Sequence, residues 1–161
     1  MTDLHLDFET FSEVDLRVVG TYRYCEDRST EALMLGWAID DGPVDVWDIT
    51  SGEAMPPDLY AALHSDALIW AFHATFERLM LLKLGYIPAL ERFRCTMVLA
   101  YSLSFAGGLN ECLTRFHMPV TKQSDGRAAI NRFSKLQPAN REVRRWGPWN
   151  DGDGWARFKS Y

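Results

Sequence analysis

Two carboxylates stand two residues apart near the start of the chain, in the segment LHLDFET at positions 4–10. Apolar and polar residues alternate there, so a β-strand would place Asp7 and Glu9 on the same face. Two neighbouring carboxylates repel each other as anions unless a cation or a shared proton relieves the repulsion. Their oxygen atoms are ligands that a divalent ion such as Mg2+ prefers. Asp7 and Glu9 are therefore candidate metal ligands, and the alternative is a polar strand face exposed to solvent.

A third acid, Glu77, lies in the first turn of a predicted helix that directly follows a buried strand. The continuous apolar run ALIWAF at positions 67–72 predicts the strand, and the apolar spacing of residues 73–84 predicts the helix, with Gly85 as its C-terminal cap. Open α/β sheets place their sites at the carboxyl ends of central strands. We therefore expect Glu77 to face the first two acids.

The remaining segments predict the scaffold that holds these acids. Strands over residues 31–39 and 44–49, joined by a turn at the sequence DDG, would form a three-stranded antiparallel unit with the first strand. Residues 11–28 are expected to form an ordered loop, and residues 119–153 a long, partly irregular segment. Further helices are expected over residues 56–64, 95–101 with Thr96 as a cap, 109–116, and 154–161 with Asp153 as a cap. This mixture of strands and helices is that of an α/β domain.

The composition is that of one globular domain spanning residues 1–161. The chain has a mass of 18.5 kDa, with 47% hydrophobic and 24% charged residues. The sequence holds no apolar run of about 18 residues and no secretory signal, so we expect a cytoplasmic protein without a membrane partner. Cys25, Cys95 and Cys112 are odd in number and widely spaced, which argues against both a disulfide framework and a zinc site.

Charge is distributed unevenly along the chain. The net charge is −5, yet residues 121–161 hold 9 Lys and Arg against 4 Asp and Glu, while the rest holds 8 against 18. A basic cluster can contact phosphates, and an acidic site can bind a phosphodiester when metal ions bridge the two. The alternative for the basic segment is a solvated charged face.

Two segments together resemble a known family. Residues 7–10 (DFET) and 72–77 (FHATFE) are similar to the first two motifs of the DEDD-type 3′-5′ exonucleases, and the likeness is closest to the proofreading domain of phage-type family A DNA polymerases. The similarity covers nearly the whole chain. Its weaker features are residues 20–24, 37–41, 95–97, 122–126 and 155–161.

The resemblance implies a ribonuclease-H-like fold, with a mixed sheet of about five strands flanked by helices. It implies that Asp7, Glu9 and Glu77 bind two Mg2+ or Mn2+ ions, of which one activates the attacking water and the other stabilises the leaving 3′-oxygen. The substrate would be the 3′ end of single-stranded DNA, although the motifs do not distinguish DNA from RNA. Thr10 would lie near the terminal nucleotide. His73, which stands where relatives carry Asn, would also help hold the substrate.

The third motif of this family is Tyr-x-x-x-Asp, in which the Tyr orients the water and the Asp completes the metal cage. Tyr161 fits the Tyr, and the sequence stops there, so the final helix and the third motif are cut short. The resemblance therefore implies impaired activity for these residues alone, with a polymerase domain or another chain as the partner that supplies the carboxylate.

The alternative is a catalytically inactive module. It would bind nucleic acid or a protein through the basic segment and its tryptophans, Trp146, Trp149 and Trp155.

Overall fold

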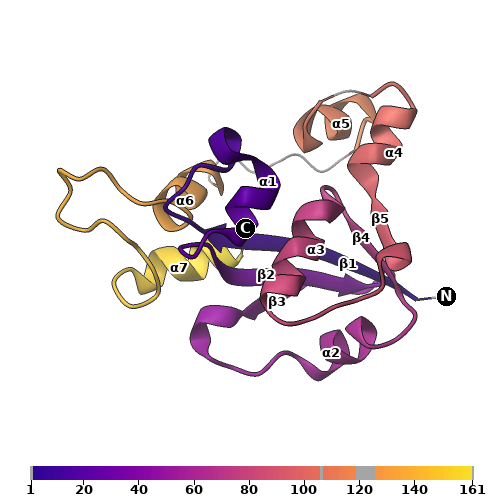
Figure 1. The fold of residues 1–161 in the computed structure, drawn as a ribbon, viewed down its shortest axis with the longest axis horizontal. Coiled ribbons are helices and arrows are strands. Elements are labelled where there is room, and N and C mark those ends of the chain that lie inside the picture. Colours follow the sequence, from indigo (N-terminus) through magenta and orange to yellow (C-terminus); the bar gives the residue numbers. More distant parts are fainter. Residues whose placement is uncertain (1, 106, 119–125, 161) are drawn as a thin grey trace.

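The computed structural model describes residues 2–105, 107–118 and 126–160. Its centre is a five-stranded mixed sheet with the strand order β3-β2-β1-β4-β5 (Figure 1). β1 pairs antiparallel with β2, β2 pairs antiparallel with β3, and β4 runs parallel to both β1 and β5. The strands are β1 (Asp3–Phe11), β2 (Glu31–Ile39), β3 (Asp45–Asp48), β4 (Leu68–Ala71) and β5 (Phe93–Cys95). The predicted α/β class, the sheet of five strands and the antiparallel unit at its start are confirmed.

Seven α-helices surround the sheet in the described residues. They are α1 (Leu16–Glu26), α2 (Pro57–Leu63), α3 (Ala74–Lys83), α4 (Thr96–Ser102), α5 (Leu109–Arg115), α6 (Gly126–Phe133) and α7 (Gly152–Lys159). Short 3-10 turns lie at Ile49–Ser51 and Leu90–Arg92. The predicted helices over 56–64, 73–84, 95–101 and 109–116 correspond to α2, α3, α4 and α5. None of the helices described is both long and apolar enough to span a membrane.

The prediction of a loop over residues 11–28 is wrong, because α1 lies there. The helix is interrupted at Gly20, whose φ of 76° and ψ of 166° are not helical. Only Tyr24 and Cys25 of this helix are buried. A helix in two short pieces with so few buried residues shows no apolar period of 3.6, which is the signal that sequence analysis needs.

The C-terminal segment also differs from its prediction. Helix α6 lies within the stretch expected to be irregular, of which residues 119–125 are outside the described residues. Helix α7 begins at Gly152 and is capped by Asp151, not by Asp153, because the Asp151 carboxylate accepts a hydrogen bond from the Gly154 N–H at 3.0 Å. Asp153 lies in the first turn instead, where an acid also favours the helix dipole.

Two apolar layers cover the two faces of the sheet. Leu4, Leu6 and Phe8 point from β1 into the larger layer, which is built with residues of α1, α2 and α3. On the opposite face, α6 and α7 lie side by side (Figure 1) and close a smaller layer. Its buried members are Phe11, Leu33, Met34, Phe133, Trp155 and Phe158.

A β-bulge interrupts the pairing of the two central strands. Glu9 pairs with Met34, whereas Thr10 pairs with Ala32, so Leu33 is an extra residue without a partner on β1. Leu33 and Met34 consequently both point into the smaller layer, under α6 and α7. Bulges are common beside functional sites, where they redirect side chains.

Candidate active site

Asp7 and Glu9 lie on the same face of β1, as the alternation in the sequence predicts. Asp7 is exposed and Glu9 half-buried, and both line a pocket of about 290 Å³. The opposing strand contributes small residues there, because Gly36 pairs with Asp7, and Ala38 pairs with His5. The pocket exists because these two positions on β2 carry almost no side chain.

Glu77 is buried in the first turn of α3, with 4% of its surface exposed. The pKa of its carboxyl group is raised to about 8, chiefly by burial and also by the negative charge of Asp7, while backbone hydrogen bonds from Glu77 itself and from Phe8 oppose the rise. Its Oε2 atom has no hydrogen-bond partner in the described structure. A buried carboxylate oxygen without a partner is costly and calls for a functional explanation.

The sheet topology explains why Glu77 comes close to β1. β4 pairs only with Asp3–His5 of β1, so β1 continues beyond the end of β4. The chain turns into α3 at that point, so the first turn of α3 lies beside the part of β1 that β4 leaves unpaired. The backbone of Phe8 forms a hydrogen bond with the Glu77 carboxyl group there. The charge of Asp7 acts on Glu77, and the expectation that Glu77 faces both acids stays a prediction.

The two predicted substrate contacts lie at the ends of these elements. His73 is half-buried at the N-cap position of α3, and its side chain makes no capping hydrogen bond. Thr10 is buried on the face of β1 opposite Asp7, and its hydroxyl oxygen lies 2.9 Å from the Tyr24 hydroxyl oxygen. Their contact with a nucleotide stays a prediction. Tyr161 lies outside the described residues.

The predicted metal ligands fit a divalent cation in their chemistry. They offer hard oxygen donors, and the Oε2 atom of Glu77 lacks a partner that a cation would supply. Among residues 2–105, 107–118 and 126–160, however, no three His, Cys, Asp or Glu side chains are already grouped as a metal site. The two-ion site of Asp7, Glu9 and Glu77 therefore stays a prediction.

Sequence analysis missed the residues that form the walls of the pocket. Val46 comes from β3, and Val44 directly precedes this strand. Phe158 and Lys159 come from the last turn of α7. Gly36, inside a predicted strand, was the one available signal, since a glycine there often marks a close approach of another group. The contribution of α7 is not visible in sequence, because it depends on a contact between distant segments.

Asp48 connects α7 to the sheet through polar contacts. Its carboxylate accepts hydrogen bonds from the Trp155 Nε1–H at 2.8 Å and the Thr50 hydroxyl at 2.6 Å, and it forms an ion pair with Lys159 at 3.2 Å. Burial acts to raise the pKa of Asp48, but the hydrogen bonds from Thr50, Trp155 and Lys159 outweigh it and hold the pKa below its usual value. The last turn of α7 is thereby held over the pocket that contains Asp7.

Comparison with known proteins supports part of the resemblance. No protein-family model matches the chain. The chain is 36% identical over 168 aligned residues to a DNA polymerase of Bacillus phage SP02, and the alignment covers 100% of this chain and 26% of that polymerase. The chain thus spans about a quarter of the length of this relative.

A solved structure described as the apo form of a nuclease has a similar fold. The TM-score is 0.55 with 19% sequence identity, and the match covers 85% of this chain and 61% of that chain. Together with the strand order β3-β2-β1-β4-β5, this match agrees with the ribonuclease-H-like fold predicted from the sequence. The chain is therefore similar in sequence to part of a phage DNA polymerase and shares the fold of a nuclease.

Proposed function

We propose that the chain is a metal-dependent 3′-5′ exonuclease domain of the proofreading type, which hydrolyses single-stranded DNA from its 3′ end. The observation that carries the proposal is the buried carboxyl group of Glu77 beside Asp7, with one oxygen atom that lacks a hydrogen-bond partner. The fold shared with a nuclease and the identity to a phage DNA polymerase support the same function.

In this proposal Asp7, Glu9 and Glu77 hold the divalent ions. Bound Mg2+ or Mn2+ would supply an activated water and stabilise the leaving 3′-oxygen. His73 helps to hold the terminal nucleotide, Thr10 lies near it, and Tyr161 orients the water. A polymerase domain is the proposed partner, because the similar phage protein is a DNA polymerase.

A gel assay with 5′-labelled single-stranded DNA tests the proposal. We expect Mn2+ or Mg2+ to produce a ladder of products shortened from the 3′ end, and EDTA to abolish it. Asp7→Asn and Glu77→Gln should slow the trimming by more than about 100-fold, the upper end of what changes to supporting residues cost in metal sites. Asp45→Asn is the matched control, because Asp45 is exposed on β3 and does not line the pocket of Asp7 and Glu9.

Two results would contradict this function. Internal cuts in the labelled strand would indicate an endonuclease. If Glu77→Gln trims the strand as fast as the wild type does, Glu77 has no part in the reaction, and the proposal loses the residue on which it depends.

A nucleic-acid-binding module without activity is the second candidate. Residues 126–160 hold 8 Lys and Arg against 3 Asp and Glu, in a chain whose net charge is −5. Salt-dependent binding of the labelled strand, with no trimming in Mg2+ or Mn2+, would favour this candidate.

A further inference from the structure

A second pocket lies between α6, α7 and the segment that joins them. Its volume is about 980 Å³. Three arginines from three different elements line it together with the ring of Trp146: Arg132 from α6, Arg141 from the connecting segment and Arg157 from α7. We call it the arginine pocket.

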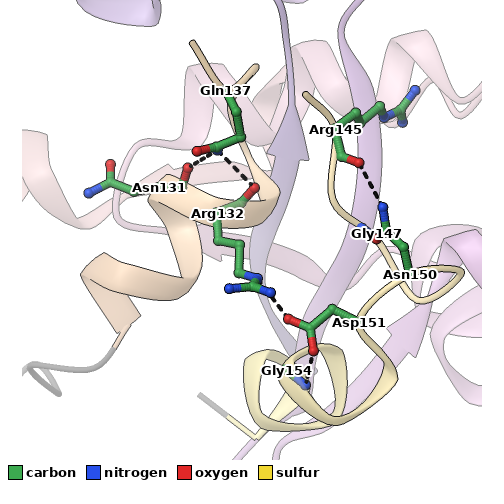
Figure 2. A network of polar contacts seen from close by, with 8 residues as sticks. All are labelled: Asn131, Arg132, Gln137, Arg145, Gly147, Asn150, Asp151 and Gly154. Atoms are coloured by element: carbon green, nitrogen blue, oxygen red, sulfur yellow. Dashed lines mark hydrogen bonds and ion pairs between the residues drawn. The ribbon is translucent and has the colours of Figure 1, made fainter. Parts of the chain in front are cut away.

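Its wall is held in place by Arg132, which joins the two helices (Figure 2). The Arg132 Nε–H donates to Asp151 at 2.7 Å, and the Arg132 guanidinium carbon lies 3.8 Å from the centre of the Trp146 ring. The same Asp151 caps α7 through the Gly154 N–H. The guanidinium plane and the indole are therefore fixed before any ligand arrives.

Gln137 holds the first part of the connecting segment in place. The Gln137 backbone N–H donates to the carbonyl oxygen of Arg144 at 2.7 Å, which closes the loop that carries Arg141. The Gln137 side-chain amide donates to the carbonyl oxygen of Asn131 at 2.8 Å, at the end of α6 (Figure 2). A site whose walls are already ordered loses less conformational entropy on binding.

Two of the three arginines have their charge available. Arg141 and Arg157 are exposed, and they belong to none of the ion pairs formed among the described residues. The lining also holds two acids: Asp151, which forms an ion pair with Arg132, and the exposed Glu142. Guanidinium groups beside an aromatic ring suit a ligand that carries both phosphates and planar bases.

The last turn of α7 connects the arginine pocket to the acids. Arg157 and Ser160 line the arginine pocket, while Phe158 and Lys159 line the pocket of Asp7 and Glu9. The two pockets are therefore separated by no more than one helix, which is about 10–12 Å wide with its side chains. A strand whose 3′ end lies at the acids would cross this turn within a few nucleotides.

We propose that the arginine pocket binds the phosphodiester backbone of single-stranded DNA a few nucleotides upstream of the 3′ end. The placement of the 3′ end rests on the proposed exonuclease function. The binding of the strand itself rests on the exposed Arg141 and Arg157.

Fluorescence polarisation with a labelled dT12 strand in EDTA tests the binding over a range of salt concentrations. In the double variant Arg141→Ala/Arg157→Ala, the slope of log K against log salt should fall by about 1.4, or about 0.7 for each lost phosphate contact. The control is Arg17→Ala/Arg28→Ala, which removes the same charge from exposed positions outside both pockets and should keep the wild-type slope. Equal slopes in both double variants would overturn the proposal. So would displacement of dT12 by poly-glutamate of equal charge as effectively as by unlabelled dT12.

A trimming assay separates this proposal from the proposed function. With Mn2+, the double variant at Arg141 and Arg157 should trim dT12 more slowly than the wild type at low substrate concentration, and should cleave dT3 at the wild-type rate, because dT3 is too short to reach the pocket. If the chain cleaves neither strand but the difference in slope persists, the exonuclease function fails and the binding site stands. If the chain trims dT12 and the double variant behaves like the control, the binding site fails and the exonuclease function stands.

Discussion

The carboxyl group of Glu77 is held where ionisation is costly. It is 4% exposed, its Oε2 atom has no hydrogen-bond partner in the described structure, and the charge of Asp7 acts on it. The sequence placed Glu77 in the first turn of a helix after a buried strand, and that placement is confirmed. Its degree of burial could not be predicted, because it depends on how closely α3 packs against β1.

The pKa of Glu77 predicts how stability depends on pH without metal. The folded protein keeps a proton on Glu77 up to a pH of about 8, whereas the unfolded chain releases it near its usual value of 4.5. Stability should therefore fall as pH rises between these values, by up to about 1.4 kcal/mol for each unit. Glu77→Gln should remove this fall and be more stable than the wild type at pH 8. Urea unfolding of the wild type and of Glu77→Gln in EDTA, at several pH values, measures this pH dependence.

The control for this experiment is Glu13→Gln, at an exposed position. It should leave the pH dependence unchanged. Parallel stability curves for the wild type and Glu77→Gln would mean that Glu77 ionises normally in the folded protein.

Thr10 illustrates a residue whose environment differs from what its motif suggests. Its hydroxyl is buried against the hydroxyl of Tyr24, in a helix that the sequence did not reveal. A double-mutant cycle with Thr10→Val and Tyr24→Phe should give a coupling free energy of about 1 kcal/mol, the usual net contribution of one hydrogen bond. Urea unfolding of the four proteins measures it. A coupling near zero would leave the Thr10 hydroxyl available to a substrate.

At the scale of elements, predictability followed the strength of local signals. β2 and α3 are uninterrupted segments of 9 and 10 residues that are rich in apolar side chains, and both were predicted. β5 has three residues and α1 is broken at Gly20, so neither produces a periodic pattern over enough residues. The bulge at Leu33 also has no local signature, because it arises from the pairing of β2 with β1.

The attachment of α7 to β3 through Asp48 yields a prediction about this helix. Asp48→Ala should lower the free energy of unfolding by about 1–3 kcal/mol, because it leaves the buried Trp155 Nε1–H without its acceptor. Asp48→Asn keeps an acceptor and loses mainly the ion pair with the exposed Lys159, so it should cost less than about 1 kcal/mol. Hydrogen exchange should show α7 opening more often in the alanine variant.

Asp45→Ala is the matched control for this prediction, because Asp45 lies on the same strand and is exposed. If Asp48→Ala is no less stable than this control, α7 is held by its apolar contacts alone.

At the scale of the whole molecule, opposite charges are divided between two parts of the fold. The acidic part carries Asp7, Glu9 and Glu77, and the basic residues 126–160 form α6, α7 and the wall of the arginine pocket. The sequence revealed this division of charge. It did not reveal that α7 lies across the sheet next to the acids, since that contact joins β3 to a helix more than a hundred residues later.

Folding, proton binding and metal binding should be linked in this molecule. At pH 7 Glu77 is mostly protonated, given its pKa of about 8, so a divalent ion that binds its carboxylate must displace a proton. When Mn2+ binds at pH 7, we expect the protein to release close to one proton. Calorimetry in two buffers with different ionisation enthalpies measures this release, because the buffer that takes up the proton changes the observed heat. Mn2+ should also raise the melting temperature, since it binds the folded state alone. Asp7→Asn should weaken binding and reduce the proton release, because it removes a ligand and the charge that raises the Glu77 pKa, whereas Asp45→Asn should do neither. Binding without proton release would show that the ion avoids Glu77, and an unchanged melting temperature would show that the acids do not form a metal site in this chain.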